Sequence, residues 1–377
     1  MSKSDIRALT GIRGVAAIAV AAYHFFPIDR AHDIVLANTL GRGYLCVDLF
    51  FILSGYVMAL NYAKPFAERI TTESFGDFLI RRLARIYPLY LAIIVARLVY
   101  TFALYPNFAQ RADLLAVAST DLPRDLGANL LLVQSWGVAP SIVGQAWSIS
   151  TEWGAYLLFP VLVQVALFAR SRTAAAVAVA AATVVALAAF VDVHDGAFHS
   201  GMLDAYDGRE VGPLLRCVGG FTLGLLVYRL SAWRPVRRLA APGAIGVAAV
   251  ALLFVALAAG LPDLAVYPLF PLLVLHLAVG QGPVARGLST RLAVRLGELS
   301  YAIYLLHIYV IPLFRGMEAR LAPVLPQVAA ATASFTIAAA ALLALSWAAY
   351  EFIEVPGRDL VRTFHVGARK PRHGVPL

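Results

Sequence analysis

The chain has 377 residues, of which 60% are hydrophobic and only 14% are charged. Soluble domains carry about 25% charged residues, so this composition excludes an ordinary soluble protein and indicates one that crosses a membrane several times. The net charge of +9 does not indicate nucleic-acid binding, because excess Lys and Arg in a membrane protein more often mark cytoplasmic loops. Cys46 and Cys217 both lie in apolar segments and do not predict a disulfide framework.

Segments of about 20 mainly apolar residues are expected to span the membrane as helices. Ten such segments cover residues 9–27, 44–62, 84–104, 146–169, 174–193, 212–230, 241–260, 264–281, 296–315 and 327–350. The apolar stretch 127–138 is too short for a span and is expected to be interfacial or re-entrant.

The distribution of Lys and Arg predicts the orientation of these spans. With the N-terminus in the cytoplasm, the cytoplasmic connections carry roughly three Lys or Arg for each one outside. We therefore expect an all-α polytopic membrane protein with ten transmembrane helices and both termini cytoplasmic. Residues 1–356 would form the transmembrane domain, and 357–377 a basic, disordered tail at the membrane surface. The acidic outer loop 194–211 is either solvated or part of an acceptor site.

The first expected span contains two ionisable side chains, Arg13 and His24. They are 11 residues apart, which places them about 17 Å apart along a helix and within roughly 20° of each other around it. A charge inside a membrane-spanning helix is costly and by default marks a functional site. Arg13 is expected near the cytoplasmic side and His24 near the outer side.

Two carboxylates are expected at the depth of His24, on other helices. Asp48 follows the start of the second span and Glu152 follows the start of the fourth, and both starts are predicted to be outside. A histidine beside a carboxylate suits general acid–base catalysis. The alternative is a histidine that only hydrogen-bonds a neighbouring helix, and for His307 in the ninth span the two interpretations are equally open.

Basic residues at the cytoplasmic start of the third span favour a different chemistry. Arg82 and Arg85 are three apart, so on a helix they share a face, and paired guanidiniums suit phosphate recognition. The alternative is that Arg81, Arg82 and Arg85 only orient the span and contact lipid headgroups.

The chain resembles membrane-bound acyltransferase family 3, a family of bacterial integral membrane acyltransferases that modify surface sugars and some small molecules. The resemblance extends over nearly the whole chain. It rests on LTGIRGVAAIAVAAYHF at 9–25, CVDLFFILSGYVM at 46–58, RRLARIYPLYL at 81–91, QAWSISTEWGAYLLFP at 145–160, LGELSYAIYLLH at 296–307 and FIEVPGR at 352–358. Thr10 and Cys46 depart from the residues usual in the family, and Trp153 stands at a second acidic position, a substitution that the family also shows.

The resemblance implies a reaction and assigns residues to it. The donor would be cytoplasmic acyl-CoA, commonly acetyl-CoA, and the acceptor a hydroxyl on an extracytoplasmic glycan or glycolipid, at the bacterial inner membrane. Arg13 and His24 match the essential arginine and histidine of the family's first span. Arg82 and Arg85 match its RxxR motif, and we expect the three arginines to bind the donor. Asp48 and Glu152 match its acidic positions, so we expect either of them to orient His24 as general base.

Other functions remain open at this stage. No metal is predicted, because no zinc-ligand spacing occurs in the sequence. A transporter of a lipid-linked or small solute would also have ten spans with buried ionisable residues, but the inverted repeats typical of transporters are not found. An acyltransferase for a small secreted molecule, or for a nitrogen instead of an oxygen, would share the chemistry and differ only in the acceptor.

Overall fold

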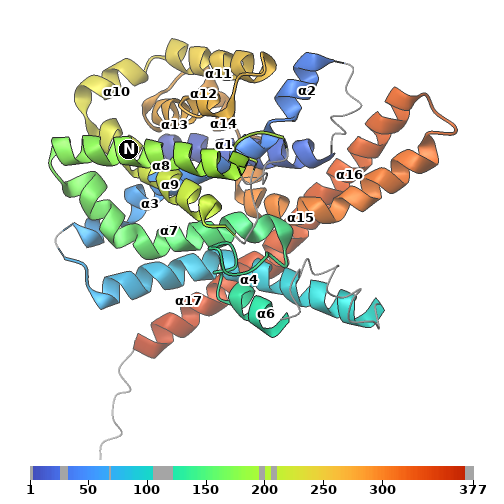
Figure 1. Cartoon of the computed structure of the whole chain (residues 1–377), viewed down its shortest axis with the longest axis horizontal. Coiled ribbons are helices and arrows are strands. Elements are labelled where there is room, and N and C mark those ends of the chain that lie inside the picture. The colour runs from blue at the N-terminus through green and yellow to red at the C-terminus, as the bar shows by residue number, and fades with distance from the viewer. Residues whose placement is uncertain are drawn as a thin grey trace, which may run out of the picture.

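The computed structural model describes residues 3–25, 33–67, 69–104, 122–194, 200–204 and 210–369. Within these ranges the protein is all-helical, as expected (Figure 1). The longer helices are α1 (Lys3–Phe25), α3 (Cys46–Tyr62), α4 (Thr72–Leu104), α7 (Trp147–Val163), α8 (Ser171–His194), α9 (Gly212–Ala232), α11 (Gly243–Ala258), α13 (Leu269–Val279), α15 (Arg291–Leu321), α16 (Gln327–Ala349) and α17 (Val355–Arg369). The shorter ones are α2 (Ile34–Leu40), α6 (Leu122–Leu130), α10 (Arg234–Ala240), α12 (Asp263–Val266) and α14 (Pro283–Leu288), with single turns at Gly43–Leu45, Lys64–Phe66, Gly144–Ala146, Gln164–Phe168 and Tyr350–Glu354.

Eight helices of the described residues are long and apolar enough to cross a membrane, so the protein is a multi-pass membrane protein. The expected spans at 241–260 and 264–281 are shorter than predicted. Pro242 begins α11, which is bent by 67° from α10, while Pro262 and Pro268 precede α12 and α13. Proline removes a backbone donor and ends a preceding helix, so these segments fold as short pieces. Counting the bent pair as one span gives up to nine, and the predicted count of ten is not confirmed.

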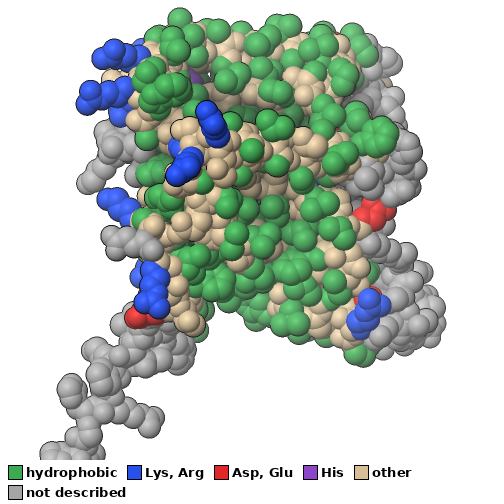
Figure 2. All heavy atoms as spheres, turned by 60° about the vertical axis from the view of Figure 1, so that its left-hand side comes forward, with side chains coloured by type: hydrophobic (Ala, Val, Ile, Leu, Met, Phe, Trp, Pro, Cys, Tyr) green, Lys and Arg blue, Asp and Glu red, His purple; other side chains and the backbone are tan. Residues whose placement is uncertain are grey.

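The surface of the molecule agrees with a membrane location. Figure 2 shows hydrophobic side chains over the middle of the visible face, with most of the visible Lys and Arg on its left-hand side and one more group at its lower right. Large exposed hydrophobic side chains include Leu187 on α8, Leu252 on α11 and Trp347 on α16. A soluble protein rarely exposes so much contiguous apolar surface, whereas lipid would cover it.

Close helix pairs form the centre of the bundle, and glycines allow their approach. Helix α1 packs along α15, where a Cβ at Gly14 would lie 2.7 Å from the backbone nitrogen of Gly297. Helix α3 packs along α9, where a Cβ at Gly55 would collide with the carbonyl oxygen of Phe221. Small residues at helix crossings allow membrane helices to pack backbone to backbone, and here they bring α1, α3, α9 and α15 around one interior.

The C-terminal region differs from the expectation of disorder after residue 356. Helix α17 continues to Arg369 and packs against α4, with Gly357 lying on Pro88. Helix α17 follows α16 without a break, through the π-helical turn Tyr350–Glu354, so one apolar helix extends from Gln327 to Thr363. Residues 370–377 lie outside the described ranges, as does most of the loop 194–211.

Candidate active site

Two neighbouring cavities lie inside the bundle. The first, here called the arginine cavity, is lined by Arg13, Ser54, Arg82, Arg85, Glu152, Tyr156 and Tyr301, among others. The second, here called the histidine cavity, is lined by Tyr23, His24, Arg97, Gln145, Asp204, Arg216 and His307, among others. Val47 and Tyr304 line both cavities, so a layer of side chains that includes these two lies between them.

Three parallel helices connect the levels of the two cavities. Along α1 the chain passes from Arg13 to His24, and along α4 from Arg85 to Arg97. Along α15 it passes from Tyr301 to the level of the histidine cavity. A helix rises about 1.5 Å per residue, so Arg13 and His24 are about 17 Å apart along α1, one at each cavity.

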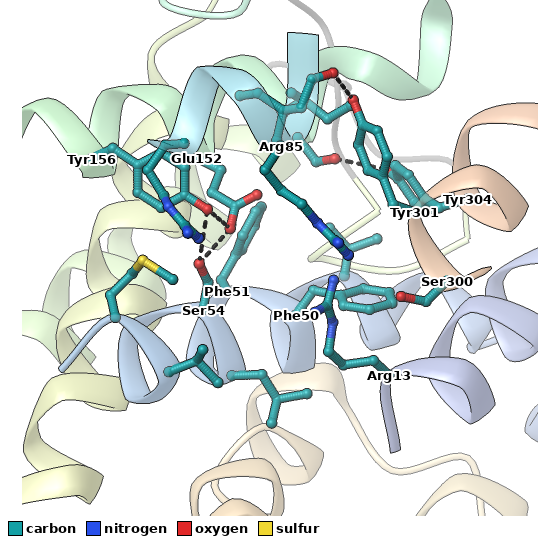
Figure 3. A pocket seen from close by; sticks show the side chains of 18 residues that line it. Arg13, Phe50, Phe51, Ser54, Arg85, Glu152, Tyr156, Ser300, Tyr301 and Tyr304 are labelled. Atoms are coloured by element: carbon teal, nitrogen blue, oxygen red, sulfur yellow. Dashed lines mark hydrogen bonds between the residues drawn. The ribbon is translucent and has the colours of Figure 1, made fainter. Parts of the chain in front are cut away.

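The arginine cavity brings together the three arginines predicted to bind the donor. Arg13 comes from α1, and Arg82 and Arg85 share one face of α4. In Figure 3 the guanidinium groups of Arg13 and Arg85 extend toward the same space. Arg82 donates a hydrogen bond of 2.8 Å to the Tyr62 hydroxyl, and its guanidinium lies 5.0 Å from the centre of that ring. Several guanidiniums around one cavity can bind an anion with several oxygens, such as a phosphate.

Glu152 lies in the arginine cavity and not beside His24, so the predicted His24–Glu152 pairing is wrong. Its carboxylate accepts hydrogen bonds from the Ser54 hydroxyl and from the Tyr156 hydroxyl, the latter at 2.6 Å (Figure 3). One carboxylate opposite three arginines reduces the repulsion between the cations, while leaving net positive charge for an anionic ligand.

The segment before α7 explains the unexpected depth of Glu152. Ile142, Val143 and Ala146 are fully buried, so α7 starts inside the protein and not at its surface. Several polar groups of this segment are bonded internally: the Asn129 amide donates to the carbonyl of Asp125 at 2.8 Å and accepts from the backbone of Ile142 at 3.0 Å. Non-helical backbone at membrane depth is tolerated only under such internal bonding. As predicted, 127–138 does not form a membrane-length helix.

His24 and His307 meet in the histidine cavity, from α1 and α15. The Nε2 of His307 lies 3.2 Å from the Nδ1 of His24, and their ring centroids are 4.8 Å apart. The Nδ1 of His307 lies 2.6 Å from the Tyr304 carbonyl oxygen, and the Nδ1 of His24 lies 2.9 Å from the Val20 carbonyl oxygen. Because a carbonyl only accepts, each Nδ1 carries the proton when its ring is neutral.

These two carbonyls determine the tautomers and so the available lone pairs. The Nε2 of His307 is an acceptor that faces the Nδ1–H of His24. The Nε2 of His24 is then unprotonated, and the His24 side chain is exposed to the cavity. His24 Nε2 can therefore accept a proton from a group in the cavity, while His307 binds the Nδ1–H on the other side of the His24 ring.

Asp48 is also not the partner of His24, contrary to the expectation. It is fully buried and accepts two hydrogen bonds of 2.8 Å, from the Nε and Nη2 of Arg216 on α9. The Arg216 guanidinium lies 5.4 Å from the Trp147 ring and is 1% exposed. Asp48 therefore compensates a buried arginine in the wall of the histidine cavity, and contributes no hydrogen bond to His24.

The carboxylate that does line the histidine cavity belongs to a loop. Asp204 accepts a hydrogen bond of 2.7 Å from the Tyr23 hydroxyl and one of 3.0 Å from the backbone of Ser200. Tyr23 in turn stacks edge-on against His24, with ring centroids 4.7 Å apart. Residues 200–204 thus place part of the expected acceptor loop 194–211 at this cavity.

Sequence analysis missed Asp204, Arg97 and Arg216 as parts of the site. Arg216 had a usable signal: it lies at the start of a span, at the same predicted depth as Asp48, and a buried charge in a membrane needs a partner. Within the described residues no three His, Cys, Asp or Glu side chains are grouped as metal ligands, and metal-free chemistry stays a prediction.

Comparison with known proteins gives a consistent set of matches. Residues 6–351 match the sequence model of a family described as "Acyltransferase domain". The chain is 30% identical to "Acyltransferase MdmB" of Streptomyces mycarofaciens over 338 residues, which is 80% of this chain and 78% of that protein. It is 28% identical to "Peptidoglycan O-acetyltransferase OatA" of Listeria monocytogenes over 162 residues, 42% of this chain and 24% of that protein. No solved structure matches significantly.

Proposed function

We propose that this chain, which belongs to the acyltransferase family matched over residues 6–351, transfers an acyl group from acyl-CoA to a hydroxyl acceptor. That it is a membrane O-acyltransferase, for groups other than aminoacyl groups, follows from the family and its relatives. The transporter alternative is thereby set aside. The donor, the base and the acceptor are the subject of the proposal.

The observation that carries the proposal is the pair of cavities with a shared wall. One holds three arginines and the other two histidines, and Tyr304 belongs to both. A donor with a phosphate-bearing head and a long arm ending in a reactive thioester fits this order. We assign the phosphates of acyl-CoA, with acetyl-CoA as the expected form, to Arg13, Arg82 and Arg85, and the thioester to the region of Tyr304.

His24 is the general base of the proposed reaction. Its Nε2 takes the proton of the acceptor hydroxyl while the hydroxyl oxygen forms a bond to the thioester carbonyl carbon. The imidazolium that results donates Nδ1–H to the Val20 carbonyl and to the Nε2 of His307, which stabilises it. The carbon–sulfur bond then breaks, and the CoA thiolate takes the proton from His24 Nε2, which restores the neutral ring. We place Asp48 as a positioning residue for Arg216, and Glu152 as the counter-charge of the arginine cavity.

The membrane orientation and the acceptor complete the proposal. Placing the arginine cavity toward the cytoplasm, with both termini on that side, agrees with the bias of Lys and Arg toward cytoplasmic connections. His24 then faces the extracytoplasmic side of a bacterial inner membrane. A relative is named a peptidoglycan O-acetyltransferase, which favours an extracytoplasmic glycan or glycolipid acceptor for this chain.

The test uses cells that express the intact protein and acetyl-CoA as donor. Mass spectrometry of surface glycans is expected to show the mass gain of an acetyl group, and membranes given radiolabelled acetyl-CoA are expected to label the same fraction. His24→Gln should abolish labelling, whereas Arg81→Gln, a change on an exposed arginine outside both cavities, should not. Full labelling by His24→Gln would overturn the base assignment, and acyl transfer without acyl-CoA would overturn the donor.

A further inference from the structure

A third cavity, here called the lateral groove, lies between α4 and α15. Its lining includes Ile93, Ala96 and Tyr100 from α4, and Ile308 and Pro312 from α15. Positions three or four apart on a helix share a face, so one stripe of each helix forms the groove. The volume is about 600 Å³, larger than the 490 Å³ of the histidine cavity.

The lateral groove opens to the outside of the bundle. Ala96 and Pro312 are exposed, and Tyr100 and Tyr309 at the groove have exposed fractions of 54% and 37%. Both α4 and α15 are long and apolar enough to cross a membrane. The groove is therefore an apolar channel on a surface that faces lipid, between two helices that also form the active site.

Arg97 lies where the lateral groove joins the histidine cavity. Arg97 and Ile308 line both, so the two spaces adjoin at these side chains. The Arg97 side chain is only partly buried, and Tyr309 lines the groove beside it. An arginine at the depth of a membrane span is costly and marks a functional site. A guanidinium offers five N–H donors in a planar fork, which suits a phosphate group.

The polarity of the lining changes along the path from the lateral groove to His24, and this order identifies the occupant. The path leads from an apolar groove to one cation, Arg97, and then to a polar cavity with the proposed catalytic histidine. The acyl chain of a longer acyl-CoA would not fit this order, because its methylene groups would lie against Arg97. A lipid-linked acceptor does fit: an apolar chain, a phosphate, and a sugar whose hydroxyl reaches His24.

We propose that the lateral groove binds the apolar chain of a lipid phosphate-linked acceptor, with the phosphate on Arg97 and the acceptor hydroxyl at His24. The acceptor thus enters sideways from the membrane and not from water. This inference rests on the proposed function, because it takes the histidine cavity as the place of transfer. It assigns to Arg97 a role in acceptor binding, distinct from the donor-binding arginines.

The test is photocrosslinking of the full-length protein in lipid nanodiscs with photoreactive farnesyl phosphate, and with photoreactive farnesol as the probe that lacks the phosphate. Labelled peptides are located by mass spectrometry. Farnesyl phosphate is expected to label residues 93–101 and 306–312, and unlabelled farnesyl phosphate to compete. Arg97→Gln should weaken the apparent affinity about tenfold or more for farnesyl phosphate only, since a charge-assisted hydrogen bond is lost.

A matched pair of tryptophan variants tests the groove itself. Ala96→Trp fills it, whereas Val99→Trp adds the same ring to a side chain of α4 that is 62% exposed and outside the groove. Ala96→Trp should remove the labelling and Val99→Trp should retain it. Equal labelling by farnesol, displacement by palmitoyl-CoA, or equal labelling by a photoreactive phosphatidylcholine would each overturn the inference. Labelling of the groove by the probe, together with no acetyl transfer to surface glycans by cells that express the protein, would instead overturn the proposed function.

Discussion

Removing the charge of Asp48 should destabilise the protein far more than removing a surface carboxylate. Asp48→Asn keeps the shape of the side chain but leaves the Arg216 cation uncompensated. Both side chains are at most 1% exposed, so water cannot replace the lost partner. Breaking a buried ion pair costs about 3–5 kcal/mol. We expect the lower part of that range, because an unfolded chain in a micelle finds other polar partners.

A double-mutant cycle separates the pair interaction from other effects of each change. Arg216→Met alone leaves the Asp48 carboxylate buried and unpaired, so it should also cost about 3 kcal/mol. Asp48→Asn with Arg216→Met removes both charges and should cost much less than the sum of the single changes. Asp359→Asn is the matched control, since the Asp359 side chain is 64% exposed. Its Oδ1 lies 3.9 Å from the Nε of Arg358, and an exposed ion pair of this kind is worth about 0–1 kcal/mol.

The assay is unfolding of the purified protein in dodecylmaltoside micelles with increasing sodium dodecyl sulfate. Circular dichroism follows the helices, and tryptophan fluorescence follows the site, since Arg216 lies over Trp147. The reasoning is refuted if Asp48→Asn costs no more than Asp359→Asn. It is also refuted if the costs of the single changes add in the double variant to within about 0.5 kcal/mol.

Three further predictions concern donor binding, the histidine pair and helix packing. Arg85→Ala should raise the KM for acetyl-CoA about tenfold to a hundredfold, since charge-assisted hydrogen bonds are worth about 1.5–3 kcal/mol. Arg81→Ala, a change at an exposed arginine, is the control, and an equal effect of that change would contradict the donor site. His307→Leu should lower kcat about tenfold or more at constant KM, because His24 loses its hydrogen-bond acceptor. His307→Gln can still accept a hydrogen bond and should retain part of the kcat. A Gln variant as slow as the Leu variant would disprove the role of the hydrogen bond between His24 and His307. Gly55→Ala should cost about 1–3 kcal/mol of unfolding free energy, because its Cβ would collide with a carbonyl oxygen on α9. Gly76→Ala, with no atom within 4 Å, should gain about 0.5–1 kcal/mol, and equal shifts in the two variants would refute the packing argument.

The parts of the site that depend on single helices were predictable from the sequence. Arg13 and His24 share a face of α1, and Arg82 and Arg85 share a face of α4, because helix geometry relates residues close in the chain. The membrane-spanning character followed in the same way from the length of apolar segments. Two spans were overestimated, since composition does not reveal where a proline divides an apolar stretch into short helices.

The pairings between distant segments could not be derived in this way. The depth predicted for Glu152 assumed that α7 starts at the membrane surface, whereas the buried segment before it moves the start inward. Asp48 and Arg216 are 168 residues apart, and no local pattern connects them. The contact of His24 with His307 likewise depends on the register between α1 and α15, which the glycines of that crossing determine only once the two helices are packed.

The layer formed by Val47 and Tyr304 has a consequence for the permeability of the membrane. In the proposed reaction only a few atoms pass this layer, while the coenzyme stays on one side and the acceptor on the other. No open pore is needed at any stage, so free ions have no route along the path of the acyl group, and the proton that passes in each turnover stays bound, first to His24 and then to the sulfur of the coenzyme. The proposed reaction would thus join an activated donor on one side of the membrane to an acceptor on the other without opening the membrane to ions.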